Sequence, residues 1–152
     1  MSPHLGYVKH FRDLEVYRKQ RLLAKEVFEL SSGFPPEERY SLTDQLRRAS
    51  RSIGGQIAEA WGKRLYPRHF VSKLTDADGE QLETQHWILE AADCAYLTEV
   101  DAKRLLDLCE QIGRMLGAMM KKAERFASGD YCLQDEQASY LPEHPTASTS
   151  GP

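Results

Sequence analysis

Apolar residues recur at three- and four-residue intervals in four segments of the chain, which is the period of an amphipathic α-helix. The segments cover roughly residues 14–30, 41–62, 67–96 and 98–126. In the second segment, one buried seam is expected to contain Leu42, Leu46, Ala49, Ile53, Ile57 and the pair Ala60 and Trp61. No segment shows the strict alternation of a half-buried strand. The pattern therefore predicts an all-α protein.

Helix-ending and helix-starting residues separate these segments. Pro35 and Pro36 prevent the first helix from continuing. Ser41 is predicted to cap the second helix, with Asp44 reaching back to it, and Thr98 is predicted to cap the fourth. Because short connections force neighbouring helices to be antiparallel, the sequence predicts an antiparallel up-down-up-down four-helix bundle.

Composition limits the chain to one ordinary soluble domain. Its 152 residues are 41% hydrophobic and 28% charged, and no apolar run approaches the roughly 20 residues needed to span a bilayer. No signal-peptide pattern begins the chain, and its three cysteines are widely spaced, so a cytoplasmic location is expected. We expect residues 1–127 to form the bundle. Residues 128–152 contain Pro, Ser, Thr and acids but no Lys or Arg, and are expected to be a disordered tail.

Positive charge gathers in the second helix and the turn after it, although the formal net charge of the chain is −3. All 20 Lys and Arg but only 19 of the 23 acids lie within residues 1–127. The folded part is therefore more basic than the whole chain, and nucleic-acid binding is compatible with its charge. The candidate nucleic-acid-binding residues are Arg47, Arg48, Arg51, Lys63, Arg64 and Arg68.

This basic stripe has two interpretations, a solvated helix face or a surface that contacts phosphates without sequence readout. The aromatic residues Trp61, Tyr66 and Phe70 near the turn either stack on bases or cap the core. Residues 76–101 are acidic and contain no Lys or Arg. This acidic helix can pair with the basic helix of its own subunit or of a neighbouring copy.

Two alternative functions compete with nucleic-acid binding. Glu83 and His86 form one Glu-x-x-His unit of the kind that builds di-iron sites in helical bundles, but the chain has no second copy, so a metal-binding enzyme is disfavoured. A scaffold for protein partners is favoured if apolar residues outside the main seam, such as Val16, Val71 and Met115, form a subunit interface. The sequence predicts a non-enzymatic protein with no cofactor, catalytic or metal site, and no membrane partner.

Glycines inside the second helix lack the pattern of a phosphate-binding loop. Gly54 and Gly55 are instead expected to let a neighbouring helix approach closely.

Several short motifs between about residues 11 and 120 occur together in one known family. They are Phe11-x-Asp13-Leu14, Phe34-Pro35-x-x-Glu38-x-Tyr40, Gln45-Leu46-Arg47-Arg48-Ala49, Ile57-Ala58-Glu59 followed by Gly62, and Glu80-x-x-Glu83. With these motifs the chain resembles the bacterial four-helix-bundle family. That family includes the proteins encoded in 23S ribosomal RNA intervening sequences and the accessory variability determinant (Avd) proteins of diversity-generating retroelements. The resemblance implies a ring-like homopentamer whose basic residues bind RNA or DNA and, in the Avd branch, a reverse transcriptase partner.

Overall fold

The computed structural model describes residues 8–129, and these residues contain helices and no strand. The prediction of an all-α protein is therefore confirmed. In chain order the helices are the 3-10 helix η1 (Phe11–Asp13), α1 (Glu15–Ser31), the 3-10 helix η2 (Pro36–Glu38), α2 (Leu42–Gly62), α3 (Pro67–Asp93), α4 (Glu99–Lys121) and α5 (Ala123–Ser128). Most of the predicted C-terminal tail lies outside the described residues.

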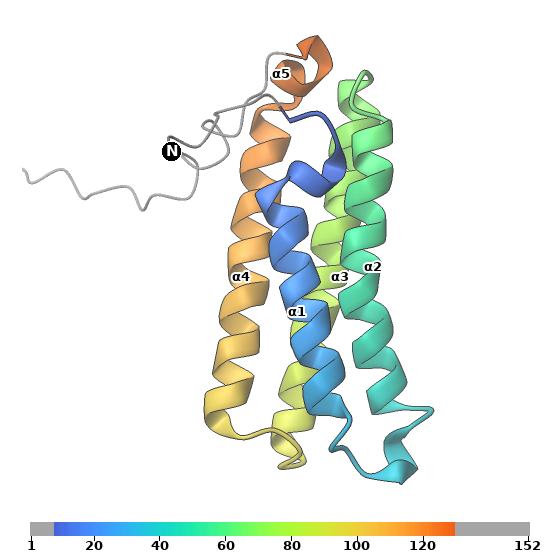
Figure 1. Cartoon of the computed structure of the whole chain (residues 1–152), viewed down its shortest axis with the longest axis vertical. Helices are drawn as coiled ribbons and strands as arrows, with labels where there is room; N and C mark the ends of the chain where they lie inside the picture. The colour runs from blue at the N-terminus through green and yellow to red at the C-terminus, as the bar shows by residue number, and fades with distance from the viewer. Residues whose placement is uncertain (1–7, 130–152) are drawn as a thin grey trace, which may run out of the picture.

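The four long helices lie side by side (Figure 1). The connections from α1 to α2 and from α3 to α4 lie at one end, and the connection from α2 to α3 lies at the other end together with α5. The most extensive packing joins α2 to α3, and α1 also contacts both α2 and α4. Each long helix therefore turns an apolar face to two neighbours. No helix among residues 8–129 is both long and apolar enough to cross a bilayer.

The core lies between the four long helices and contains the seam expected for the second helix. On α2, Leu46, Ile53 and Ile57 are fully buried, while Trp61 is half-buried at the end of the helix. The largest fully buried side chains are Leu14, Leu23, Leu46, Ile53, Ile57, Phe70, Leu74, Ile88, Leu105, Ile112, Leu116 and Met119. The buried seam predicted for the second helix is therefore confirmed, whereas Phe28, Leu82 and Leu89, which continue the apolar period of the first and third helices, are exposed.

The residues expected to form a second apolar face are not exposed. Val16 and Met115 are buried in the core of this chain, and Val71 packs against that core. The expectation that they line a subunit interface is wrong, because the buried stripe of each helix is wider than a single seam. The large apolar side chains that are exposed are Leu22, Phe28, Tyr40, Leu65, Tyr66, Leu82, Leu89 and Val100.

The start of α2 is capped by a glutamate rather than by the expected serine. The side chain of Ser41 caps no amide of α2. Its hydroxyl donates to Glu38 Oε2 at 2.7 Å, and the same oxygen accepts the Leu42 amide at 3.3 Å. The hydroxyl of Tyr96, between α3 and α4, donates to Glu38 Oε1 at 3.3 Å. Glu38 therefore joins the start of α2 to the α3–α4 connection.

We expect Glu38→Gln to lower the melting temperature at pH 7. The hydrogen bonds from Ser41 and from the Leu42 amide hold the pKa of Glu38 below its ordinary value. Because the folded state has the lower pKa, this stabilisation is present above the unfolded pKa of the carboxyl and is lost as the pH falls through the folded pKa. Thermal melts of wild type and variant should therefore converge in acid.

Glu37→Gln is the matched control for this substitution. Glu37 is the exposed neighbour of Glu38, and no hydrogen bond to its side chain occurs within the described part of the chain. Its replacement should leave the melting temperature nearly unchanged at every pH. A constant difference between wild type and Glu38→Gln from neutral pH into acid would contradict the charged cap.

The third and fourth predicted helices end at other residues than expected, but the fourth begins as expected. Thr98 Oγ1 caps the start of α4 by accepting the Asp101 amide at 3.1 Å. However, the expected fourth helix is divided at Lys122, and α5 folds back so that the rings of Phe126 and Phe70 lie 4.8 Å apart. The third helix ends at Asp93, three residues earlier than expected, through a left-handed residue, Ala95.

Candidate nucleic-acid interface

The six predicted cations do not form one continuous patch. Arg47, Arg48 and Arg51 lie in the first half of α2, whereas the other three lie at the α2–α3 turn. Arg47 and Lys63 are about 24 Å apart along the helix at 1.5 Å per residue. The basic stripe of the sequence is therefore two groups of cations at different positions along the axis of α2.

Arg47 is occupied by contacts with the end of α1. Its Nε donates to Ser31 Oγ at 2.8 Å, and its Nη2 donates to the Phe28 carbonyl at 3.3 Å and to Ser32 Oγ at 3.3 Å. Its guanidinium lies 4.6 Å from the centre of the Phe28 ring. Arg47 therefore joins α2 to the end of α1.

Arg48 pairs with the acidic helix of its own chain. Its Nη1 lies 3.6 Å from Glu80 Oε2, and its Nη2 forms a hydrogen-bonded ion pair with Glu83. Burial raises the pKa of Glu80. Burial acts in the same direction on Glu83, but hydrogen bonds from Arg48 and from Trp87 outweigh it and lower the pKa of that carboxyl. Basic α2 and acidic α3 thus pair within one subunit.

The cations at the α2–α3 turn have fewer interactions within the chain than Arg47 and Arg48. Arg64 lies over the Trp61 ring at 4.3 Å and donates to the Trp61 carbonyl at 3.0 Å. Lys63 and Arg68 are exposed, and no ion pair involves either of them among residues 8–129. Exposed Arg51 likewise has no ion pair in this range, although its guanidinium lies 5.8 Å from the Phe28 ring. These three cations are the ones best placed to meet an anion.

The aromatic residues near the turn divide between the two expected roles. Phe70 is fully buried, and half-buried Trp61 packs edge-on against Phe126 at 6.4 Å, so both belong to the end of the core. Tyr66 is exposed and remains accessible to a partner.

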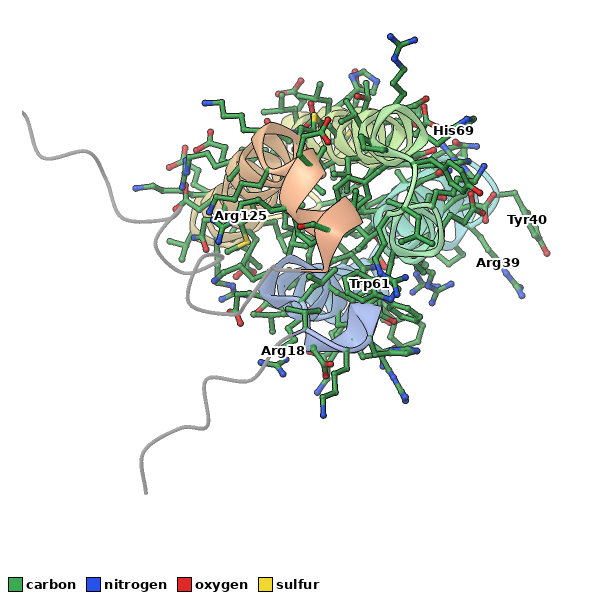
Figure 2. The ribbon with its side chains drawn as sticks, turned by 90° about the horizontal axis from the view of Figure 1, so that it is seen from above. Arg18, Arg39, Tyr40, Trp61, His69 and Arg125 are labelled. Atoms are coloured by element: carbon green, nitrogen blue, oxygen red, sulfur yellow. The ribbon has the colours of Figure 1, made fainter. Side chains whose placement is uncertain are left out.

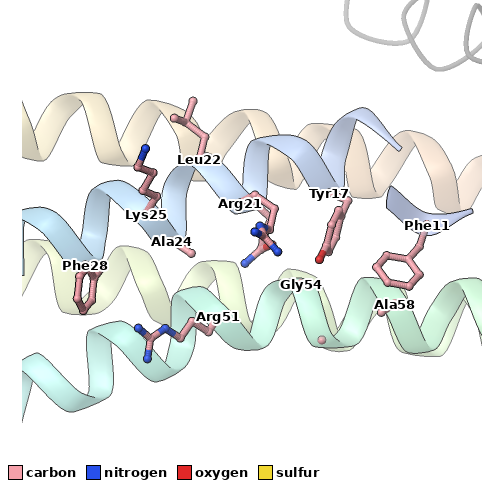
Figure 3. A pocket seen from close by; sticks show the side chains of 12 residues that line it. Phe11, Tyr17, Arg21, Leu22, Ala24, Lys25, Phe28, Arg51, Gly54 and Ala58 are labelled. Atoms are coloured by element: carbon pink, nitrogen blue, oxygen red, sulfur yellow. The ribbon is translucent and has the colours of Figure 1, made fainter. Parts of the chain in front are cut away.

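A groove between α1 and α2 adds cations that the sequence analysis missed. It has a volume of about 700 Å³ (Figure 3). Its lining residues are Phe11, Tyr17, Gln20, Arg21, Leu22, Ala24, Lys25, Phe28, Arg51, Gly54, Gly55 and Ala58. Arg21 and Lys25 come from α1, where Arg18, Arg21 and Lys25 recur at helical spacing. That spacing was the sequence signal for a basic face on α1.

A second hollow continues the basic surface toward the start of α2. Its volume is about 600 Å³, and it is lined by Arg39, Tyr40, Thr43, Asp44, Arg47, Arg48, Arg51 and Ser52. Arg51 lines both hollows. Figure 2 shows Arg39 and Tyr40 projecting outward from the helices. The basic surface therefore follows the α1–α2 side of the molecule rather than α2 alone.

The Glu-x-x-His unit on α3 is arranged for surface contacts. Glu83 accepts hydrogen bonds from Arg48 and from Trp87 Nε1, the latter at 3.2 Å. His86 is exposed, and its Nε2 lies 4.0 Å from Glu90 Oε1. Within residues 8–129, no three His, Cys, Asp or Glu side chains converge as a metal site.

Comparisons with known proteins agree with this fold. A family model described as the 23S rRNA-intervening sequence protein matches residues 12–118. One similar solved structure is the crystal structure of a protein of unknown function from the S23 ribosomal protein family of Bacteroides thetaiotaomicron. Its sequence is 24% identical to this chain, and the two structures superpose with a TM-score of 0.63. The match covers 70% of this chain and 98% of that one, and at this identity it supports the fold alone. A comparison with curated proteins gives no match. The family match covers most of the chain, which therefore belongs to the 23S rRNA-intervening sequence protein family.

Proposed function

We propose that this protein is a non-enzymatic oligomer that binds RNA or DNA through basic residues exposed on its surface. The observation that carries this proposal is that Arg51, Lys63 and Arg68 are exposed and have no ion pair among residues 8–129. Exposed cations without an ion pair attract a polyanion and position it without reading its bases. An accessory role beside a reverse transcriptase, or in another RNA-associated process, rests on the Avd resemblance.

The assembly unit in this proposal is an up-down-up-down four-helix bundle. The packing of α1 on both α2 and α4, together with short connections, supports this arrangement. We propose the homopentamer implied by the family resemblance as the oligomer. Repetition of one basic surface around a ring would multiply the modest attraction of each subunit.

The non-enzymatic part of the proposal is supported by how Glu83 and His86 are used. The Glu83 carboxylate is held by Arg48 and Trp87, and His86 faces solvent. A di-iron site would need Glu and His side chains that project inward from several helices. Glu83 instead joins α3 to α2 through Arg48, and His86 is exposed.

A titration tests the proposal directly. Structured RNA, single-stranded DNA and duplex DNA are added to the full chain at low and physiological salt, and the mass of the oligomer is measured in parallel. We expect an oligomer whose affinity falls linearly with salt on a log–log scale, by about 0.7 to 0.9 per phosphate contacted. Binding that does not change with salt, or no binding to any of the three, would overturn the proposal.

A scaffold for protein partners is the second candidate, and the exposed face of α3 favours it. Leu82 and Leu89 are about half exposed there and are seven residues apart, so they lie on the same side of the helix. Acidic Glu90 and Asp93 are exposed on the same helix. An oligomer that binds no nucleic acid would favour this candidate, with the charges acting in assembly.

A further inference from the structure

Small residues of both helices line the groove between α1 and α2. They are Ala24 on α1 and Gly54, Gly55 and Ala58 on α2. A Cβ atom added to Gly54 would lie 2.4 Å from Gln20 Oε1, so the Gln20 side chain lies directly on this glycine. Its Nε2 donates to the Ser50 carbonyl at 3.0 Å. The floor of the groove is therefore closed by Gln20, and the space above it stays open.

The charge along the groove has a single sign. Arg21, Lys25 and Arg51 line it, and none of its described lining residues is acidic. Among residues 8–129, neither Arg21 nor Arg51 has an ion pair. Lys25 Nζ lies 4.0 Å from Glu29 Oε1, but both side chains are mostly exposed, and such pairs contribute little. A linear anion is the ligand that complements this lining.

Aromatic rings stand at both ends of the groove (Figure 3). Phe28 is 46% exposed, although apolar rings of this size are usually buried. At the other end, the rings of Tyr17 and Phe11 meet edge to face with centroids 4.9 Å apart. The cations Arg21 and Arg51 lie between these ends. Positive charge beside an accessible aromatic ring is the arrangement with which proteins hold unpaired bases. Here Phe28 is exposed, and Tyr17 and Phe11 are partly buried against the core.

We propose that this groove binds single-stranded nucleic acid. Arg21, Lys25 and Arg51 contact successive phosphates, and Phe28 and Tyr17 stack on bases. The inference rests on the proposed nucleic-acid function and specifies its site and ligand. A duplex keeps its bases stacked on one another, so the exposed Phe28 ring favours a single strand. RNA and DNA strands share the phosphate and stacking chemistry, and both are included in the test.

The test measures binding of a 20-nucleotide oligo(U), an oligo(dT) of the same length and a mixed-sequence duplex to the full chain. The Arg21→Gln, Arg51→Gln double variant should weaken binding of the single strands and reduce the magnitude of the log–log salt slope by about 1.4, since each lost contact removes about 0.7. The matched control removes two exposed cations of α4, with Lys103→Gln and Arg114→Gln. It should bind as wild type does.

Stacking is tested separately by Phe28→Leu, which keeps an apolar side chain and removes the ring. We expect affinity for the single strands to fall about five- to hundredfold, with the salt slope unchanged because no phosphate contact is lost. Thermal melts confirm that the variant is folded. An unchanged affinity would overturn the stacking role and with it the assignment to single strands.

The other outcomes separate the site from the function. Loss of binding in a Lys63→Gln, Arg68→Gln variant, with none in the Arg21, Arg51 variant, would overturn the groove and keep nucleic-acid binding at the α2–α3 turn. Equal loss in the α4 control would show a response to net charge alone and overturn the groove. Duplex binding as tight as single-strand binding, or capture of an acidic helical peptide in place of oligonucleotides, would also overturn it. No binding by wild type would overturn both proposals.

Discussion

Replacing Phe70 with alanine is expected to lower the free energy of unfolding by about 3–5 kcal/mol. Phe70 lies in the first turn of α3 and is fully buried. Its ring lies 4.8 Å from that of Phe126 on α5, which closes the same end of the core. Truncation removes the apolar contacts and leaves a cavity that neighbouring helices fill only in part. Urea unfolding followed by circular dichroism measures the loss.

Leu65→Ala is the matched control, because Leu65 lies in the α2–α3 turn just before α3 but is 66% exposed. Its replacement should change stability by less than about 0.5 kcal/mol. Phe126→Ala, made in the wild type and in the Phe70→Ala variant, completes a double-mutant cycle. Since the two rings are in contact, we expect a coupling of about 0.5–3 kcal/mol between Phe70 and Phe126. Strict additivity would show that α5 does not pack on Phe70 in solution.

The sequence identified the four long helices because their period depends on local geometry alone. Side chains three and four residues apart share a helix face, so Leu46, Ile53 and Ile57 had to be buried together. The period does not determine how wide the buried stripe is. Val16 and Met115 lie beside the main seams, and only the positions of the neighbouring helices decide that they are covered.

The helix ends were predictable where the cap is local. Thr98 caps α4 through an amide three residues away, and that spacing is visible in the sequence. Ser41 had the right spacing as well, but Glu38 of η2 reaches the Leu42 amide and recruits the serine hydroxyl. The division of α4 from α5 depends on Phe126 reaching the core near Phe70, which is a tertiary contact.

The candidate site was predictable in residue type but not in partners. The local pattern does not indicate that Arg47 contacts the end of α1 or that Arg48 pairs with Glu80 and Glu83, because these contacts join residues 15 to 35 positions apart. The candidate cations predicted from the sequence also all lay in α2 and around the turn after it. Arg21 of α1 lines the same groove as Arg51, because α1 and α2 pack together.

The contact between α1 and α2 can be tested at Gly54. The sequence pattern predicts a close approach of another helix at both Gly54 and Gly55. The prediction is confirmed at Gly54 alone, since a Cβ on Gly55 would meet no atom within 4 Å. Changing either glycine to alanine gains about 1 kcal/mol of helix propensity. Gly54→Ala must also displace the buried Gln20 side chain and its hydrogen bond to Ser50.

The difference between the two alanine variants therefore isolates the contact with Gln20. Because the gain in propensity is common to both, Gly54→Ala should be about 1–3 kcal/mol less stable than Gly55→Ala in urea unfolding. In a Gln20→Ala background the obstructing side chain is absent, and the two variants should then have the same stability. If Gly54→Ala matched Gly55→Ala in the wild-type background, Gln20 would not lie on Gly54, and the groove between α1 and α2 would lack its closed floor.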